Sequence, residues 1–341
     1  MKALVYEPNN KLYVMEKPVP QLDPGEVLVK VKWAGICGSD LVAWQGGFPR
    51  IKQPVTLGHE MTGEVVELYD KSITNVVPGD RVVVEPIVAC GQCEACRKGY
   101  YNVCRKLKVI GLDQDGAFAN YVKVPAIRVH RIPESLSFER AALCEPVAVV
   151  VHMLRRTDFK FGDSVGITGA GPIGVLVAMV AKRSGAVRVV ITDVNDYRLN
   201  LVRSLGITAL DAKQPDLKNR FLDVLGEEGA DVTFELAAHP DTLALAIDIT
   251  KVRGTVLLGG IFKKPPGLDL QSATLKEQHL IGTRLYTFID FVRAIELITQ
   301  NDFAVESMVS KRIGLDEASE GGFEAIKRGE NVIKVLINPE G

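Results

Sequence analysis

The stretch Ser164-Val165-Gly166-Ile167-Thr168-Gly169-Ala170-Gly171-Pro172-Ile173-Gly174 sets the architecture of the second half of this chain. Its first five residues read as a buried strand, the glycines as a tight turn, and residues 172–184 as a helix. Further strands are expected at 187–193, 231–236 and 254–260, with helices between them. Strand–helix–strand order with apolar strands predicts an α/β fold built on a doubly wound parallel sheet.

The glycine turn has the pattern of a dinucleotide site. Gly169 makes the turn, Gly171 lets the backbone approach a pyrophosphate, and Gly174 allows the helix to pack on the sheet. Pro172 and Ile173 open a helix whose free N–H groups face the phosphates. A glycine turn alone is a weak signal, so the residues after the next strand matter.

Asp193 ends that next strand, roughly twenty residues after the turn, where a carboxylate can accept the hydroxyls of a ribose. Its charge would repel a 2′-phosphate, which favours NAD(H) over NADP(H). Arg198 is expected to stack on the adenine or, as the less favoured alternative, to pair with a phosphate.

Four cysteines in one short segment have the spacing of a closed zinc site. The ligands are Cys90, Cys93, Cys96 and Cys104, in a lobe at 88–106. Four thiolates leave no open coordination position, so this zinc is structural. A nucleic-acid-binding zinc ribbon is disfavoured, since the chain has a net charge of −1, a pI of about 6.6 and no basic stripe.

A second metal site is expected from scattered residues. Cys37, His59 in Gly58-His59-Glu60, and Glu145 in Glu145-Pro146 supply a thiolate, an imidazole and a carboxylate. Such a set holds zinc with one position open for a substrate oxygen. Glu60 is expected to bind the metal directly or through water.

Two neighbouring residues bear on this second site. Asp40 is expected to orient His59 through the other ring nitrogen. Cys144 could replace Glu145 as a ligand but is better interpreted as a buried neighbour. Zinc and a dinucleotide in one chain indicate a dehydrogenase.

The length of 341 residues favours two domains. Residues 26–32 and 81–86 read as strands of a β-rich first domain. The helix expected at 288–299 and the strand at 332–337 return to it. The predicted domains are 1–150 with 285–341, which carries both zinc sites, and 151–284, which binds NAD.

Composition indicates a globular protein that acts on small molecules. Hydrophobic residues make up 47% and charged residues 24% of the chain. The N-terminus lacks a signal-peptide core, and no apolar stretch reaches membrane-spanning length. We expect a cytoplasmic protein with no nucleic-acid or membrane partner.

These motifs resemble the zinc-dependent medium-chain dehydrogenase/reductase superfamily, which joins a GroES-like catalytic domain to a Rossmann coenzyme domain. The likeness covers nearly the whole chain. Gly38-Ser39-Asp40 and Glu145-Pro146 are similar to the branch of sorbitol, xylitol and 2,3-butanediol dehydrogenases. Residues 259–262 and 280–282 also match that branch.

The resemblance implies oxidation of a secondary alcohol by NAD⁺, with two zinc ions per chain. Ser39 would carry the substrate proton, with Glu60 and Glu145 completing the catalytic centre. Trp44, Phe118 and Arg284 would line the substrate pocket, where Arg284 would bind remote hydroxyls or a carboxylate; the alternative is that Arg284 is a surface arginine on a connecting strand. Such enzymes are often tetramers, with dimers next, and a sheet edge at 255–262 would pair across a two-fold axis.

Two departures leave the substrate open. Val42 stands where many relatives carry a proton-relay histidine, and Ala43 where polyol enzymes often carry tyrosine. A polyol, diol or sugar acid is the favoured substrate. Threonine is disfavoured because its enzymes usually carry Asp-Pro in place of Glu145-Pro146. A simple alcohol, or a non-catalytic NAD-binding sensor on the same fold, are the remaining alternatives.

Overall fold

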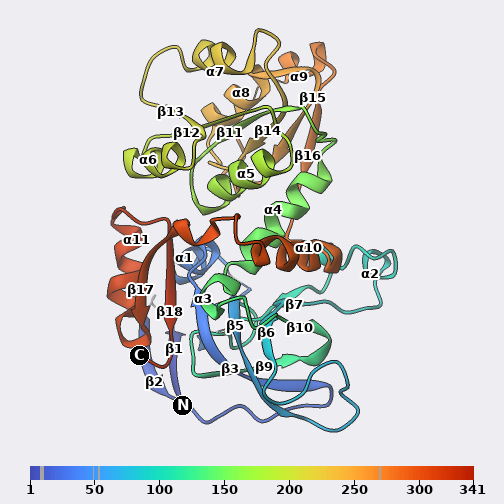
Figure 1. Cartoon of the computed structure of the whole chain (residues 1–341), viewed down its shortest axis with the longest axis vertical. Helices are drawn as coiled ribbons and strands as arrows, with labels where there is room; N and C mark the ends of the chain where they lie inside the picture. The colour runs from blue at the N-terminus through green and yellow to red at the C-terminus, as the bar shows by residue number, and fades with distance from the viewer. Residues whose placement is uncertain (8–10, 49, 53, 269) are drawn as a thin grey trace. The chain divides into compact units, whose positions relative to one another are not determined.

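The computed structural model describes residues 1–7, 11–48, 50–52, 54–268 and 270–341. It divides into two compact units (Figure 1). The first comprises Met1–Pro146 and Thr287–Gly341, and the second comprises Val147–Tyr286. The junctions predicted from the sequence stand at 150/151 and 284/285. Each unit has its own sheet system and is described by itself.

The second unit contains a parallel sheet in the order β13-β12-β11-β14-β15-β16. Its strands are β11 (Ser164–Thr168), β12 (Arg188–Asp193), β13 (Thr208–Asp211), β14 (Ala230–Glu235), β15 (Thr250–Leu258) and β16 (His279–Gly282). The order reverses beside β11, so the glycine turn lies at the switch point of a doubly wound sheet. The predicted α/β fold is confirmed.

Helices cover both faces of this sheet. They are α5 (Pro172–Arg183), α6 (Asp196–Ser204), α7 (Leu217–Leu225), α8 (Pro240–Asp248) and the short α9 (Gln271–Leu275). In Figure 1, α5 and α6 lie on one face, and α7 and α8 on the other. Under α7, Phe221 and Leu225 pack on Val190 and Leu210 of the sheet, all nearly inaccessible to water. This apolar burial fixes α7 against the sheet.

The expectation that residues 255–262 form a sheet edge is wrong. β15 lies between β14 and β16, and the outer strands of the sheet are β13 and β16. The apolar run at 255–258 reflects burial on both faces of an inner strand. The accessible edge beside it belongs to β16.

The first unit is built on a mainly antiparallel seven-stranded sheet in the order β10-β6-β5-β3-β18-β17, with β9 paired to β3. Its strands are β3 (Glu26–Gly35), β5 (Glu60–Leu68), β6 (Arg81–Val84), β9 (Tyr121–Pro125), β10 (Val129–Arg131), β17 (Val309–Gly314) and β18 (Lys334–Asn338). Because β18 pairs with β3, residues 334–338 complete the sheet on which the expected catalytic metal site is built.

Smaller elements surround this sheet. The remaining strands are β1 (Lys2–Glu7), β2 (Lys11–Glu16), β4 (Val55–Thr56), β7 (Ile87–Val88) and β8 (Lys108–Val109). The helices are α1 (Gly38–Trp44), α2 (Glu94–Arg97), α3 (Phe138–Ala141), α10 (Phe288–Thr299) and α11 (Ala325–Lys327), preceded by a π-helical turn at Ala318–Glu324, while α4 (Cys144–Arg156) starts in this unit. Across the described residues, no helix combines the length and apolarity needed to cross a bilayer.

Candidate metal and coenzyme sites

Three of the residues expected to bind the catalytic metal lie together in the first unit. Ligand atoms of Cys37, His59 and Glu60 all lie within 4.8 Å of one another. Cys37 is the N-cap of α1, and Glu60 begins β5 directly after His59. Two ligands on a tetrahedral zinc are separated by roughly 3.3–3.8 Å, so small shifts bring these atoms onto one ion.

Asp40 links two of these residues. Its Oδ2 accepts a hydrogen bond from the Cys37 N–H at 2.9 Å, and its Oδ1 lies 3.2 Å from Nδ1 of His59. This direct contact supports the expected role of Asp40 in orienting His59. With Nδ1 facing a carboxylate, Nε2 is the ring nitrogen left for a metal.

Ser39 lies beside that same nitrogen. Its hydroxyl oxygen is 3.1 Å from Nε2 of His59. Burial alone would lower the pKa of His59, but Asp40 and Cys37 raise the pKa well above the usual value for histidine. The site therefore attracts positive charge, which fits a divalent cation held by a thiolate and an imidazole.

The third group, Glu60, has a partner that the sequence analysis missed. Lys334 of β18 is 2% exposed, and its Nζ lies 2.7 Å and 2.5 Å from the two carboxylate oxygens of Glu60. Burial lowers the pKa of Lys334, but Glu60 and Cys37 outweigh that effect and raise it. Lys334 is therefore a charged lysine facing the anions of the metal site.

Close backbone packing fixes the loop that carries His59. Gly58 has a φ of +99°, and a side chain there would meet the ring of Phe118 at 2.7 Å. Hypothetical Cβ atoms on Gly111 and Gly116 would lie 2.1 Å and 2.2 Å from the Gly58 carbonyl oxygen. Only glycines at these positions allow the three loop segments to approach so closely.

The three residues expected to line the substrate pocket have different environments. Phe118 and Trp44 are buried, and both rings pack edge-on against Phe323 of the π-helical turn, with centroids 6.0 Å and 5.7 Å away. Arg284 is exposed and belongs to the second unit. The ring of Phe118 packs against Gly58. Its contact with a substrate stays a prediction.

Glu145 and Cys144 lie at the start of α4 and are both buried. Within the described part of the chain, neither belongs to the group formed by Cys37, His59 and Glu60. The negative charge of Glu145 contributes to the raised pKa of Lys334, so its carboxylate lies in the neighbourhood of Lys334. Burial, followed by the charge of Glu145, raises the pKa of the Cys144 thiol and keeps it neutral. Glu145 remains the predicted third ligand.

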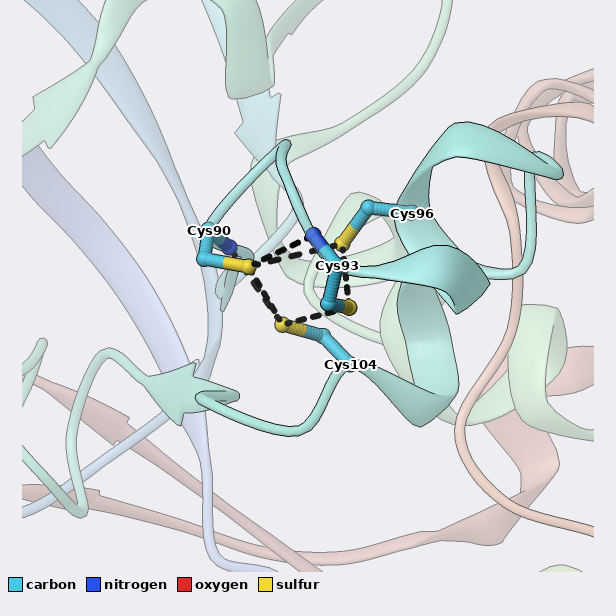
Figure 2. A group of neighbouring side chains, drawn as sticks. All are labelled: Cys90, Cys93, Cys96 and Cys104. Carbon is cyan, nitrogen blue, oxygen red and sulfur yellow. Dashed lines mark hydrogen bonds between the residues drawn. The ribbon is translucent and has the colours of Figure 1, made fainter.

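The four clustered cysteines converge on one point (Figure 2). Neighbouring sulfur atoms lie 3.4 Å (Cys90–Cys104), 3.5 Å (Cys93–Cys96), 3.9 Å (Cys93–Cys104) and 4.0 Å (Cys90–Cys96) apart. The sulfurs of a tetrahedral zinc–thiolate site are about 3.8 Å apart, whereas a disulfide needs about 2.05 Å. Backbone N–H groups of Arg105 and Cys96 lower the pKa of Cys93 to about 6, which favours the thiolate. The donor set fits zinc.

A buried cluster anchors this lobe to the sheet. Tyr101 of the lobe donates a hydrogen bond of 2.7 Å to Glu85, which also pairs with Arg128 at 2.9 Å. The Arg128 guanidinium stacks 4.4 Å from the centre of the Tyr101 ring. Burial, then the charge of Glu85, raises the pKa of Tyr101, so its hydroxyl stays a donor. The structural zinc site is therefore tied to a fully buried carboxylate.

In the second unit, the glycine turn has the expected local geometry. Gly169 has a φ of +99°, and a Cβ on Gly174 would lie 1.9 Å from the Gly169 carbonyl oxygen. No atom of the described residues lies within 4 Å of such a Cβ on Gly171, which leaves the backbone there accessible. Pro172 is the first residue of α5 and half-buried Ile173 the second, so N–H groups of the first turn point out of the sheet edge.

Asp193 ends β12 beside this turn. Its carboxylate accepts hydrogen bonds from the N–H groups of Ala170 at 2.7 Å and Asn195 at 2.9 Å. The Arg198 guanidinium lies 3.6 Å from the same carboxylate. Asp193 thus stabilises the turn, and Arg198 neutralises part of its charge; its contact with a ribose stays a prediction.

Glu235 at the end of β14 is a second residue that the sequence analysis missed. Its Oε1 accepts hydrogen bonds from the N–H groups of Ala237 and Ala238 and from Thr242, at 3.1, 2.9 and 2.8 Å. Its backbone oxygen accepts from Gly259 and Gly260. Glu235 therefore orders two loops beside the glycine turn. In the sequence, the feature that could have identified this residue was a lone acid at the end of an apolar strand.

Comparison with known proteins places the chain among dehydrogenases. Residues 23–134 match the alcohol dehydrogenase GroES-like domain, and residues 172–300 match the zinc-binding dehydrogenase domain. Sorbitol dehydrogenase of Halalkalibacterium halodurans is 35% identical, with 99% of both chains covered. L-threonine 3-dehydrogenase of Rhizobium johnstonii is 34% identical, over 99% of this chain and 98% of that one.

A solved structure shows the same fold. 2R,3R-butanediol dehydrogenase from Bacillus subtilis superimposes with a TM-score of 0.92, at 33% identity and 99% coverage of both chains. The chain belongs to the zinc-dependent medium-chain dehydrogenase/reductase superfamily, in its polyol dehydrogenase branch. It is an alcohol dehydrogenase that uses zinc and NAD(H).

Proposed function

We propose that this protein interconverts a secondary alcohol of a polyol, diol or sugar acid with the corresponding ketone. The observation that carries the proposal is the convergence of Cys37, His59 and Glu60, with Asp40 and Ser39 on the two nitrogens of His59. When bound, zinc polarises the alcohol oxygen and NAD⁺ accepts the hydride from the alcohol carbon. The relatives named sorbitol and butanediol dehydrogenase support the substrate class.

The residues of the first unit have three tasks in this proposal. Cys37, His59 and Glu145 hold the metal, and Asp40 keeps His59 in the orientation that directs Nε2 toward it. Ser39 takes the hydroxyl proton of the substrate and passes it toward solvent, so that an alcohol becomes a ketone and one proton is released. With Val42 in place of a histidine, the later steps of proton release pass through water.

The second unit is the proposed coenzyme domain. The glycine turn and the first turn of α5 bind the pyrophosphate, and Asp193 binds the adenosine ribose. The carboxylate of Asp193 disfavours a 2′-phosphate, so NAD(H) is the proposed coenzyme. Arg198 is placed to stack on the adenine while remaining next to Asp193.

A screen by NADH absorbance tests the proposal. Purified protein is offered polyols, vicinal diols, sugar acids, threonine and simple alcohols, each with NAD⁺ and then with NADP⁺. We expect turnover of a polyol, diol or sugar acid with NAD⁺. Turnover of threonine alone contradicts the substrate assignment. Cys37→Ser should abolish turnover while leaving NADH binding intact, and loss of NADH binding as well would show that Cys37 is misassigned.

We further propose that the protein is a cytoplasmic homotetramer, with a dimer as the next choice. β16 is an outer strand that pairs only with β15 among the strands the structure describes, and Leu280 on it is 38% exposed. Nearby chain segments add Leu275 and Ile261, at 77% and 72% exposed. Pairing of two such edges across a two-fold axis would cover this apolar surface. Light scattering during size-exclusion chromatography gives the mass that tests it.

A further inference from the structure

The π-helical turn at Ala318–Glu324 places one aromatic side chain between two parts of the expected catalytic site. Phe323 of this turn is inaccessible to water, and its ring packs against Trp44 and Phe118 at interplanar angles of 80° and 89°. Perpendicular ring contacts of this kind are favoured over flat stacking. π-Helical turns are rare, and they occur frequently at functional sites. Phe323 therefore ties an uncommon backbone element to two other segments of the first unit.

Trp44, the first of these partners, is the last residue of α1. That helix carries Ser39 and is capped by Cys37. A helix of seven residues is too short to be stable alone, so α1 depends on packed side chains for its position. The chain after the π-helical turn contacts Trp44 a second time, because Nζ of Lys327 in α11 lies 4.8 Å from the centre of the Trp44 ring.

Phe118, the second partner, packs against the loop that carries His59. A Cβ on Gly58 would meet the Phe118 ring at 2.7 Å, so this ring touches the backbone of the residue before His59. His59 itself lies in neither a helix nor a strand. The position of its imidazole therefore depends on side chains that pack behind the loop.

A third contact of the turn reaches the residue before Cys37. A Cβ on Gly322 would lie 2.6 Å from Cδ1 of Ile36, so the turn and Ile36 are in close contact. Together with the Phe323–Trp44 contact, this places the π-helical turn against both ends of the segment 36–44.

We propose that Phe323 is a positioning residue for the reaction, which sets the spacing between the segment of Cys37 and Ser39 and the loop of His59. The two expected ligands come from separate parts of the chain, and Phe323 packs against the ring behind each of them. A tetrahedral ion accepts a narrow range of ligand separations, so a shift of the Phe323 ring changes the coordination geometry. This inference rests on the zinc centre of the proposed function.

The test uses cobalt(II) in place of zinc in the purified protein. Zinc has a filled d shell, whereas the visible absorption of cobalt(II) depends on coordination geometry. The Cys37→Ser variant identifies the thiolate–cobalt band that belongs to this site. In Phe323→Leu we expect that band to shift. For the zinc enzyme and the substrate found by the NADH screen, kcat should fall about tenfold or more, with KM within about threefold of wild type.

Phe291→Leu is the matched control. Phe291 is equally buried in the same unit, but its ring packs on His130, with centroids 4.8 Å apart. Both substitutions leave buried space behind a smaller side chain, so both should lower Tm. We expect the control alone to keep the wild-type cobalt band and the wild-type kcat.

The outcomes separate positioning from ordinary core packing. Phe323→Leu with a lowered Tm but a wild-type band and kcat overturns the role of Phe323, as does an equal change of the band in both variants. Wild-type protein with no Cys37-dependent band overturns the metal centre, and this inference with it. If Phe323→Leu does not fold, Phe323→Met decides, because methionine fills the space without a flat ring. A shifted band in that variant supports the proposal, and a wild-type band overturns it.

Discussion

The substitution Gly116→Ala tests how the position of His59 is fixed. Gly116 has no side chain that could contact a metal ligand, and its φ lies outside the left-handed region that favours glycine. The added Cβ would, however, lie 2.2 Å from the carbonyl oxygen of Gly58 and 2.3 Å from Cα of Gly111. These two atoms belong to the backbone, so no side-chain rotation can relieve the clash.

The size of the effect follows from these distances. A methyl carbon and a carbonyl oxygen approach no closer than roughly 3.2 Å, so the Gly58 carbonyl must move by about 1 Å. His59 is the next residue and moves with it. A displacement of about 1 Å in a catalytic site costs about 100-fold in rate. Overpacking costs about 1–3 kcal/mol, which for a unit of this size lowers Tm by roughly 3–10 °C.

The assay combines kcat/KM for the substrate found by the NADH screen, zinc content per chain, and calorimetric Tm. Gly321→Ala is the matched control, because a Cβ there meets its nearest neighbour in the same unit at an ordinary 3.8 Å. We expect the control to behave as wild type. If Gly116→Ala kept wild-type kcat/KM and zinc content, the close approach of these glycines would not be what positions His59.

Three further changes test other parts of the account. Asp193→Ser removes charge-assisted bonds to a ribose, so kcat/KM for NAD⁺ should fall about 10–100-fold relative to NADP⁺; an unchanged coenzyme ratio in steady-state kinetics argues against the ribose role. Tyr101→Phe removes the hydroxyl that donates to the buried Glu85 and leaves Arg128 as its donor, so calorimetry should show about 1–3 kcal/mol lower stability and chelators should remove the structural zinc faster, whereas wild-type behaviour excludes an anchor. Burial raises the pKa of Glu235, so the folded state binds that proton more tightly and loses stability as pH rises. Glu235→Gln should therefore be more stable than wild type in urea unfolding near pH 7, with the gain absent below about pH 4.5; a gain independent of pH contradicts this.

Features encoded by neighbouring residues could be predicted from the sequence. The strand Ser164–Thr168, the glycine turn and α5 follow from local apolar pattern and turn chemistry. The four-cysteine lobe follows from ligand spacing within one short segment. Even the contact of Asp40 with His59 was accessible, because Asp40 lies in the same turn as Cys37, which it also caps.

Features that depend on distant segments could not. Lys334 and Glu60 are separated by 274 positions, and only the pairing of β18 with β3 brings them together. Within the strand expected at 332–337, a single lysine among apolar residues was the available signal, but it named no partner. Likewise, Gly111 and Gly116 read as ordinary turn residues until the close approach to Gly58 is known. The order of strands in the sheet could not be predicted either: the outer strand is β16, whereas the sequence suggested an edge at 255–262.

The central claim is that a metal ion binds between Cys37 and His59, where Ser39 can take a proton from an alcohol. Anomalous diffraction at the zinc K edge, from crystals grown with NADH, tests it most directly. We predict two anomalous peaks per chain. One marks a zinc ion among the four cysteine sulfurs, and the other marks a zinc ion bonded to Cys37 Sγ and His59 Nε2. A peak at the cysteine lobe alone, with Cys37 and His59 bonded to no metal, would contradict the account.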